Sequence, residues 1–453
     1  GDWSSDVCSS DLEEVAYSLV SSLEDASKCE QILQDFLSHR ALSEDPYSRN
    51  GGTLLDYFLT TAPNRLFRRL FHVNKETIGL LSEELCTTRA FLVARLDEKD
   101  ERFLSLLLSV SILYLNSTLS MRACAYFSGI TVPQMESYLN LFNKMMNEMK
   151  DKVIRFPSLN CQNLLKVNGK RFFPGAVGVV ESVFIPKISA VEEEEYAFSS
   201  RDRKQGIRLL LVVGRDGKLF NMHVSESGRE SSCTVFNESA LGYTLRFHKR
   251  SILNRGSFLL ASRAFPELPY LQIPFSNEEI RMSARPAALS NYNYWHHKAR
   301  HVAEKTIQRW LYRCPKCRSG LPFFSSRNCI IFVISSLVLH QMCQVMEDEW
   351  MDDDASIPCV IVASKDGEDV PGVEEEGHRV YDVNPEGVGG EVDYYDLKSM
   401  VIPERHNEAG EVVSEEAMNS MYEKLKIVAR KRRDFLVELV ALFPNRSVSM
   451  FDD

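Results

Sequence analysis

The sequence lacks an apolar run long enough to cross a membrane as a helix. Its longest apolar stretches, residues 103–115 and 329–339, both contain serine and fall short of the roughly 20 residues that a spanning helix needs. A positively charged segment followed by an apolar one, which would mark a secretory signal, is also missing from the start. We therefore interpret both stretches as helices of a protein core and expect no membrane partner.

Regularly spaced cysteines are missing as well. The eleven cysteines are scattered over 453 residues, which predicts no disulfide framework and is typical of a reducing intracellular compartment.

An overall excess of basic residues is also absent, because the formal net charge is −10. The acidic charge is concentrated in residues 346–400, where 17 acidic and 3 basic residues give a net charge of −14 and leave +4 for the rest of the chain. A mildly basic remainder is compatible with weak contact to phosphate groups.

The chain divides into six segments by composition and periodicity. The first resembles the translation of a sequencing-library adapter, and we leave it out of the expected fold. Two further segments, one polar and serine-rich and one acidic, lack the periodicity of packed helices or strands. The segments are an adapter-like stretch (1–12), a loosely ordered arm (13–63), a helical domain (64–152), an α/β domain (165–346), an acidic disordered linker (347–410) and an amphipathic helix (411–445).

One carboxylate, Glu181, interrupts the valine-rich run of residues 176–185. The run is short and β-branched, which predicts a strand covered on both faces. An unpaired buried carboxylate costs several kcal/mol, so Glu181 should be paired, protonated, bound to a cation or placed at the sheet surface.

Further strands and helices follow that run. Residues 207–213 and 219–224 flank Gly-Arg-Asp-Gly, which predicts a hairpin, and residues 258–261 form another apolar strand. Helical periods cover residues 231–238, 294–312 and 330–346, so this domain is expected to be an α/β sheet flanked by helices.

Residues 121–139 have the spacing of a helix-turn-helix. Gly129 would form the turn, Thr131 would cap the second helix and Pro133 would lie in its first turn. The residues that this helix would offer to DNA include a single cation. The alternatives are therefore weak DNA binding, or a pair of packed helices that makes no contact with DNA. They are Gln134, Ser137, Asn140 and Lys144.

A series of short motifs in this order resembles the Harbinger (PIF) transposases and the host genes derived from them, within the DDE superfamily endonucleases. The resemblance covers residues 64–340. After the helix-turn-helix it consists of residues 154–157, 173–181, 203–204, 228–236, 259–262, Asn293, Arg300, Glu304 and 338–340.

The resemblance implies a ribonuclease H-like fold with three carboxylates that hold two Mg²⁺ or Mn²⁺ ions. The family's first Asp falls on Glu181, the second on Ser262 and the third acidic position on Glu304. A further family Asp falls on Ser232, with Arg229 where the motif has Ser.

A serine hydroxyl binds Mg²⁺ poorly, so the family's nuclease activity is expected to be lost. The resulting hypothesis is a transposase-derived protein that binds DNA or protein without cutting. We expect it in the nucleus, with the cytoplasm as a second location. The alternatives are a working metal-dependent endonuclease that uses Glu181, Glu304 and another acid, and an inert interaction scaffold.

A zinc site is a rival interpretation of the third acidic position. His297, His301 and Glu304 share one helical face, and Cys314 and Cys317 follow. The alternative without a metal site is a polar helix in which Arg300 and Glu304 form an i, i+4 ion pair.

The last segment predicts a long helix that begins after Ser414. Its apolar residues recur at three- and four-residue spacing, which suits a coiled coil with a second copy or docking on the core. Residues 430–433 could be a nuclear-import signal or a solvated basic face. The resemblance also implies a separate Myb-like DNA-binding partner. The apolar positions are Met418, Met421, Leu425, Val428, Phe435, Leu439 and Leu442.

Overall fold

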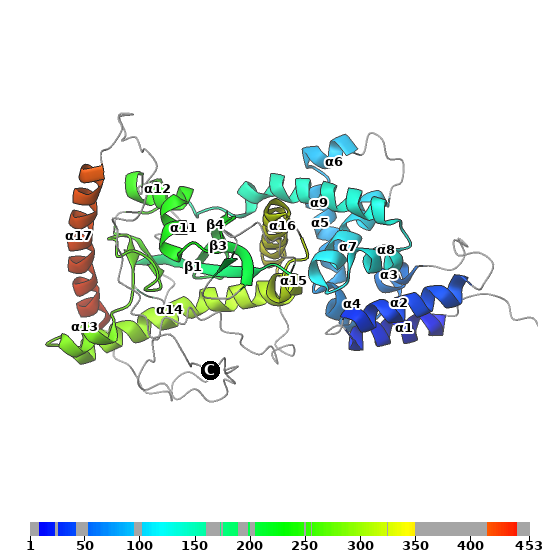
Figure 1. Cartoon of the computed structure of the whole chain (residues 1–453), viewed down its shortest axis with the longest axis horizontal. Coiled ribbons are helices and arrows are strands. Elements are labelled where there is room, and N and C mark those ends of the chain that lie inside the picture. Colours follow the sequence, from blue (N-terminus) through cyan, green and yellow to red (C-terminus); the bar gives the residue numbers. More distant parts are fainter. Residues whose placement is uncertain are drawn as a thin grey trace, which may run out of the picture. The chain divides into compact units, whose positions relative to one another are not determined.

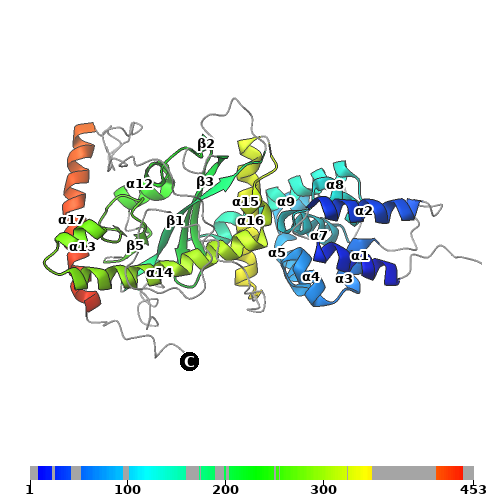
Figure 2. The ribbon, with the colours of Figure 1, turned by 60° about the horizontal axis from the view of Figure 1, so that its bottom comes forward.

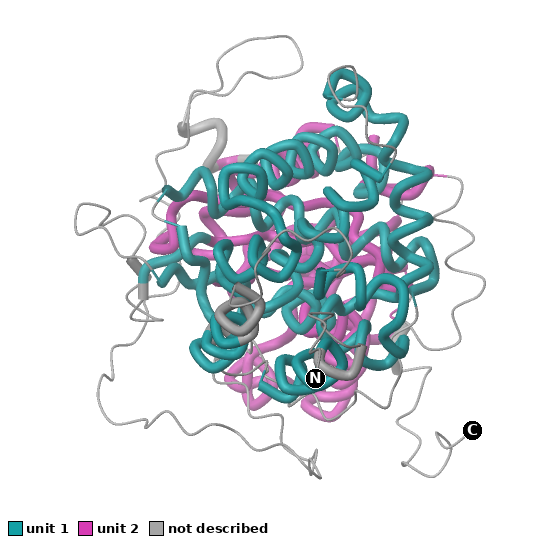
Figure 3. The backbone as a smooth tube through the Cα atoms, turned by 90° about the vertical axis from the view of Figure 1, so that its right-hand side faces the viewer, with its two compact units in different colours: residues 1–154, 185–207, 309–355 teal, residues 155–184, 208–308, 356–453 magenta. Residues whose placement is uncertain are grey.

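The computed structural model forms two compact units, which we describe separately. Unit 1 comprises residues 1–154, 185–207 and 309–355, and unit 2 comprises residues 155–184, 208–308 and 356–453 (Figure 3). Figure 1 labels the helices and strands. The residues described are 9–22, 26–41, 53–94, 102–159, 173, 175–188, 198–199, 204–248, 251–254, 256–323, 325–348 and 415–441.

Unit 1 is built from helices around α7, whose residues from Leu107 to its end are all buried. Helix α9 packs against α6, α7, α8 and α16. Figure 2 labels α7, α8 and α16 beside α9, and Figure 1 labels α6. The helices that the apolar spacing predicts in residues 64–115 are all present. The helices of unit 1 are α1 (Ser9–Ser21), α2 (Ala26–Ala41), α3 (Leu54–Thr60), α4 (Asn64–Phe71), α5 (Lys75–Leu85), α6 (Arg89–Ala94), α7 (Phe103–Asn116), α8 (Met121–Ser128), α9 (Val132–Val153), α15 (Pro315–Ser319) and α16 (Ser326–Val345).

The expected loosely ordered arm over residues 13–63 is wrong for the described part of that range. Helices α1, α2 and α3 lie there, and Leu19, Leu33 and Phe58 are buried. The Phe58 ring lies 5.4 Å from that of Phe127. Each of these helices is short or weakly apolar, so its burial depends on neighbours that are distant in sequence. Helix α1 also takes in residues 9–12 of the adapter-like stretch.

The turn between α8 and α9 has the predicted geometry. Gly129 ends α8 in the left-handed region at φ 65°, which favours glycine because it has no Cβ. Thr131 caps α9 in a capping box with Gln134, and Pro133 lies in the first turn. The use of this helix pair as a DNA-binding helix-turn-helix stays a prediction.

The two units do not coincide with the predicted α/β domain over residues 165–346, because α15 and α16 belong to unit 1. Ser335 on α16 donates a hydrogen bond of 2.7 Å to the Asn143 side chain on α9. Helix α16 extends beyond the apolar stretch at residues 329–339 and is long and apolar enough to cross a membrane by length and composition. In its most apolar window 67% of the residues are buried within the protein, as in the core helix of a soluble protein.

The acidic linker cannot begin at residue 347, because Asp348 is part of the unit 1 core. Its carboxylate accepts hydrogen bonds from the Asn74 side chain at 2.7 Å and from the Thr77 hydroxyl at 3.0 Å. The remainder of the predicted linker, residues 349–410, lies outside the described residues.

The sheet has six strands in the order β2-β3-β1-β5-β6, with β4 paired to β3. β3 and β4 are antiparallel, whereas β1 pairs parallel with β5 and β5 parallel with β6. This mixed sheet confirms the predicted α/β class. The strands are β1 (Ala176–Pro186), β2 (Phe198–Ser199), β3 (Lys204–Gly214), β4 (Leu219–Ser225), β5 (Phe258–Ala261) and β6 (Leu271–Gln272).

Two glycines shape the sheet. Gly217, at φ 80°, closes the predicted hairpin between β3 and β4, in which the Gly214 N–H donates to the Lys218 carbonyl at 2.8 Å. Gly178 in β1 lies so close to β3 that a Cβ would come within 2.6 Å of the Val213 oxygen. A side chain at this position would therefore force the two strands apart.

The remaining helices lie in unit 2 or begin there. α14 is the longest, and its last five residues belong to unit 1. The core of unit 2 joins the sheet to α11 and α12 through buried residues such as Val180, Phe236 and Leu259. These helices are α11 (Ser232–Glu238), α12 (Ala240–Phe247), α13 (Asn277–Met282), α14 (Pro286–Arg313) and α17 (Glu415–Ala441).

Candidate functional site

The strand register brings Glu181 and Ser262 together. Val180 and Ala261 are the last paired residues of the parallel strands β1 and β5, and Glu181 and Ser262 follow them directly. β5 ends at this point while β1 continues to Pro186. Glu181 therefore lies in mid-strand, beside the carboxyl end of its neighbour.

Arg300 on α14 binds Glu181. Its Nε and Nη2 atoms both lie 2.8 Å from Oε1 of Glu181, and both side chains are only 11% exposed. Burial raises the pKa of Glu181 because it penalises the charged form, and the Arg300 charge and hydrogen bond oppose that rise. The lone carboxylate of the sequence is thus paired with a guanidinium.

Glu304 lies one turn further along α14, and its charge also acts on Glu181. The His301 Nδ1 atom lies 3.2 Å from Oε2 of Glu304. Burial would raise the pKa of Glu304, but the His301 hydrogen bond and the charges of Arg300 and His297 lower it overall. Arg300 binds Glu181 at hydrogen-bond distance, and its charge also lowers the pKa of Glu304.

Ser262 is 4% exposed and begins the turn after β5. Its hydroxyl oxygen accepts a long hydrogen bond of 3.4 Å from the Ala264 N–H, and its carbonyl accepts one of 3.2 Å from the Phe265 N–H. Ser232 is the half-buried first residue of α11, where Ser231 is the cap, and Arg229 before it is exposed. Ser262 thus has a local structural role.

The rival zinc ligands do not assemble. Within the described part of the chain, no group of three His, Cys, Asp or Glu side chains is placed to hold a metal ion. Cys314 and Cys317 are buried thiols 3.4 Å apart in unit 1, whereas His297, His301 and Glu304 belong to unit 2. Lys316 stands between these two cysteines in the sequence, and its side chain is buried. Its ammonium group donates hydrogen bonds to the carbonyls of Tyr114 and Ser117.

The four residues predicted to face DNA are all exposed on α9. Gln134, Ser137, Asn140 and Lys144 alternate with the buried positions Met135, Leu139 and Phe142. The Gln134 amide oxygen already accepts hydrogen bonds from the Thr131 N–H and hydroxyl, both at 3.0 Å. Its first role is therefore to cap the helix.

The comparison with protein families agrees with this site. Residues 181–341 match the sequence model of the family described as DDE superfamily endonuclease. The matched segment begins at Glu181 and includes Ser262, Arg300 and Glu304. No curated protein and no solved structure matches the chain.

Enzymes of this family generally use divalent metals, and the donor set here does not fit a pair of them. A cation would have to displace Arg300 from Glu181. It would also find a neutral hydroxyl at Ser262 where a hard, negative oxygen is needed. The arrangement supplies one fixed positive charge in place of a metal pair.

The contact between His301 and Glu304 is not predicted from the sequence. His301 is a candidate zinc ligand there, yet in the structure it binds the Glu304 carboxylate. The i, i+3 spacing of the two residues on α14 was the available signal.

Proposed function

We propose that this protein derives from a Harbinger-type transposase and has lost strand cleavage. The DDE endonuclease match over residues 181–341 supports the origin. The order of a hairpin followed by two parallel strands supports a ribonuclease H-like core.

One observation supports the loss of strand cleavage most directly. It is the contact between Arg300 and Glu181. Two-metal cleavage needs carboxylates that are free to bind both ions, one of which activates water while the other stabilises the leaving oxygen. Here the first acidic position is bound to a guanidinium at 2.8 Å, and the second is Ser262. The third, Glu304, is engaged by His301.

The remaining role that we propose is a nuclear factor that binds DNA or protein. The exposed face of α14 beside the site carries Lys298, His301 and Lys305 at i, i+3 and i+7. Such a row can contact phosphates through charge without reading bases. A Myb-like partner would then supply sequence specificity, and the apolar residues Ile427, Val428 and Phe435 exposed on α17 offer a surface for a second copy.

A cleavage assay tests the loss. The purified chain is incubated with supercoiled and linear duplex DNA in Mg²⁺ or Mn²⁺, and we expect no nicking above a metal-free control. Cleavage that disappears in Glu304→Gln would contradict the proposal and favour a working endonuclease. Cleavage gained by Glu181→Asp with Ser262→Asp would support the assignment of the relic positions.

A binding assay tests the remaining role. Duplex binding by the whole chain should be weak and lose affinity with salt, with a log–log slope of about −0.9 for each phosphate contact. The double variant Lys298→Ala with Lys305→Ala should reduce the slope by about 2. Tight, sequence-selective binding that survives physiological salt would show a self-sufficient DNA reader instead.

A further inference from the structure

Helix α17 packs against the rest of unit 2 through a face that the apolar spacing predicts only in part. Tyr422, Ala429 and Leu436, at seven-residue spacing, are buried together with Val437. Val428 and Phe435, which the sequence pattern placed on the apolar stripe, are 52% and 62% exposed. Of the other stripe positions, Leu425 is partly buried against the core of unit 2 as predicted, and the side chains of Met418, Met421, Leu439 and Leu442 lie outside the described residues.

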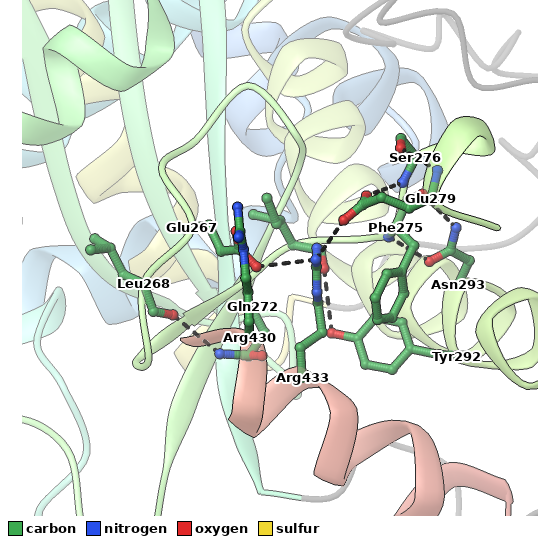
Figure 4. Close-up of polar contacts among 11 residues, drawn as sticks. Glu267, Leu268, Gln272, Phe275, Ser276, Glu279, Tyr292, Asn293, Arg430 and Arg433 are labelled. Carbon is green, nitrogen blue, oxygen red and sulfur yellow. Dashed lines mark hydrogen bonds and ion pairs between the residues drawn. The ribbon is translucent and has the colours of Figure 1, made fainter. Parts of the chain in front are cut away.

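Arg433 is the most buried cation of this face. Its Nη2 atom lies 2.6 Å from Glu279 and 3.1 Å from Glu267, and its guanidinium is 4.0 Å from the centre of the Phe275 ring (Figure 4). Its side chain is 7% exposed. Two carboxylates and an aromatic face therefore surround one guanidinium.

Arg432 makes a second set of contacts beside it. Its Nη1 donates to the Pro269 carbonyl at 2.7 Å, and its Nη2 donates to the Gly256 carbonyl at 2.6 Å. Its guanidinium lies 4.7 Å from the centre of the Phe258 ring. Carbonyl oxygens and an aromatic ring are the groups that bind a planar cation with fixed geometry.

The neighbouring Arg430 provides an internal contrast. It lies 3.5 Å from Glu267, but its side chain is 65% exposed. An exposed ion pair of this kind contributes little to stability. The binding of α17 therefore depends on two particular arginines rather than on the total charge of the run.

We propose that these groups form an arginine cradle, defined as Glu267, Glu279, Phe258, Phe275 and the carbonyls of Gly256 and Pro269, and that α17 is its releasable ligand. Residues 349–414 join α17 to Asp348, so release would not need any part of the sheet to unfold. When α17 is docked, the cradle covers two of the four cations in residues 430–433. When it is released, the same residues form a continuous basic segment that a polyanion can bind.

The ion pairs of the arginine cradle make the equilibrium between docked and released α17 sensitive to salt and to anions. Ion pairs at a partly wet surface weaken with salt, whereas apolar contacts such as those of Tyr422 and Leu436 do not. A polyanion that binds Arg432 and Arg433 competes with Glu267, Glu279 and the aromatic rings for the same groups. The docked helix thus couples exposure of the basic segment to the presence of an anionic partner.

A cut-and-retain experiment on the full chain tests the proposal. A protease recognition sequence is inserted between residues 349 and 414, the chain is cut, and size-exclusion chromatography measures how much of the α17 fragment stays with the core. We expect retention at low salt and release at about 0.5–1 M salt, where the Debye length is roughly 3–4 Å. Loss of the fragment at low salt, or retention unaffected by salt, would overturn the proposal.

Matched variants identify the contacts. Arg433→Ala should weaken retention at least tenfold, while Arg430→Ala on the same helix should change it less than twofold. Equal effects of the two variants would mean that overall charge, and not the cradle, holds the helix.

Heparin tests the competition on the same cut chain. It should release the α17 fragment at an ionic strength at which chloride alone does not. Release by heparin only where chloride also releases the fragment would contradict competition for the arginines.

Discussion

Unit 2 contains two carboxylate–arginine clusters that differ in the number of carboxylates bound to the arginine and in their exposure to solvent. At the candidate site one arginine, Arg300, neutralises Glu181, and both side chains are 11% exposed. In the arginine cradle Arg433 is shared by Glu267 and Glu279, whose side chains are 17% and 43% exposed. The first pair is nearly closed to solvent, whereas in the second cluster two carboxylates share one arginine and are more exposed.

The pKa values of the carboxyl groups in the two clusters are also shifted in opposite directions: that of Glu181 is raised and that of Glu279 is lowered. Burial raises the pKa of Glu181 despite Arg300. At Glu279 burial acts in the same sense, but the Ser276 hydrogen bonds and Arg433 lower the pKa overall. A carboxylate that burial disfavours in its charged form and that already binds an arginine is thus a poor metal ligand, while a capped, shared carboxylate is a stable docking contact.

The largest effect is expected from Arg300→Ala. The variant leaves Glu181 buried without its cation, which costs about 3–5 kcal/mol when one partner of a buried pair is removed. Hydrogen exchange of the β1 and β5 amides measures the free energy of opening. Lys298→Ala, exposed on the same helix, is the control, with less than about 0.5 kcal/mol expected.

A double variant separates lost charge from lost packing at the same position. Arg300→Met with Glu181→Met removes both charges and should recover most of the loss. If the double variant is as unstable as Arg300→Ala, the pair is not the reason for the instability.

Arg433→Ala should have a smaller effect, confined to α17. Hydrogen bonds to charged groups contribute about 1.5–3 kcal/mol, and the variant removes the hydrogen bond to Glu279 together with the ion pair to Glu267. Faster exchange of α17 amides, with β1 unchanged, would be the expected pattern. An unchanged α17 would show that Tyr422 and Leu436 hold the helix without the arginine.

Glu279→Gln should cost still less, at most about 1 kcal/mol, because the side chain is 43% exposed and Glu267 remains to pair with Arg433. Glutamine also keeps the capping hydrogen bond to the Ser276 N–H. A loss in α17 as large as that of Arg433→Ala would refute the redundancy of the cradle.

The smallest effect is a difference in pH dependence. The contribution of Glu279 is present above its ordinary pKa of 4.5 and is lost as the pH falls through its lowered folded value. The raised pKa of Glu181 has the opposite sign, so its site gains stability as the pH falls from 7 toward 4.5. The free energies of opening of α17 and β1, obtained from exchange rates corrected for the intrinsic pH dependence of exchange, should therefore change in opposite directions between pH 3.5 and 7, and parallel changes would contradict the comparison.

Much of the sheet could be predicted because its signals are local. Residues 258–261 form β5 as expected, and the Gly-Arg-Asp-Gly turn produces the hairpin. The partner of Glu181 could not be found in this way, since Arg300 is 119 residues away and had a nearer acid in Glu304. Only the tertiary fold decides between the two carboxylates.

The docked face of α17 is predicted only in part: Leu425 packs against the core as its spacing predicts, but Val428 and Phe435 are exposed. An arginine and an alanine, Arg433 and Ala429, occupy buried positions, while Phe435 does not. A pattern of apolar residues cannot reveal a face whose partners are carboxylates and aromatic rings. The capping box of Ser276 and Glu279 was a local signal, but it gave no hint of the arginine that shares the carboxylate.

Calorimetric titration of the whole chain with Mn²⁺ tests the central claim most directly. If Arg300 takes the place of a metal at Glu181 and Ser262 supplies no charge, wild-type protein should show no saturable binding up to millimolar Mn²⁺. Glu181→Asp with Ser262→Asp should create binding that Glu304→Gln then removes. Saturable micromolar binding by the wild type, abolished by Glu304→Gln, would contradict the account.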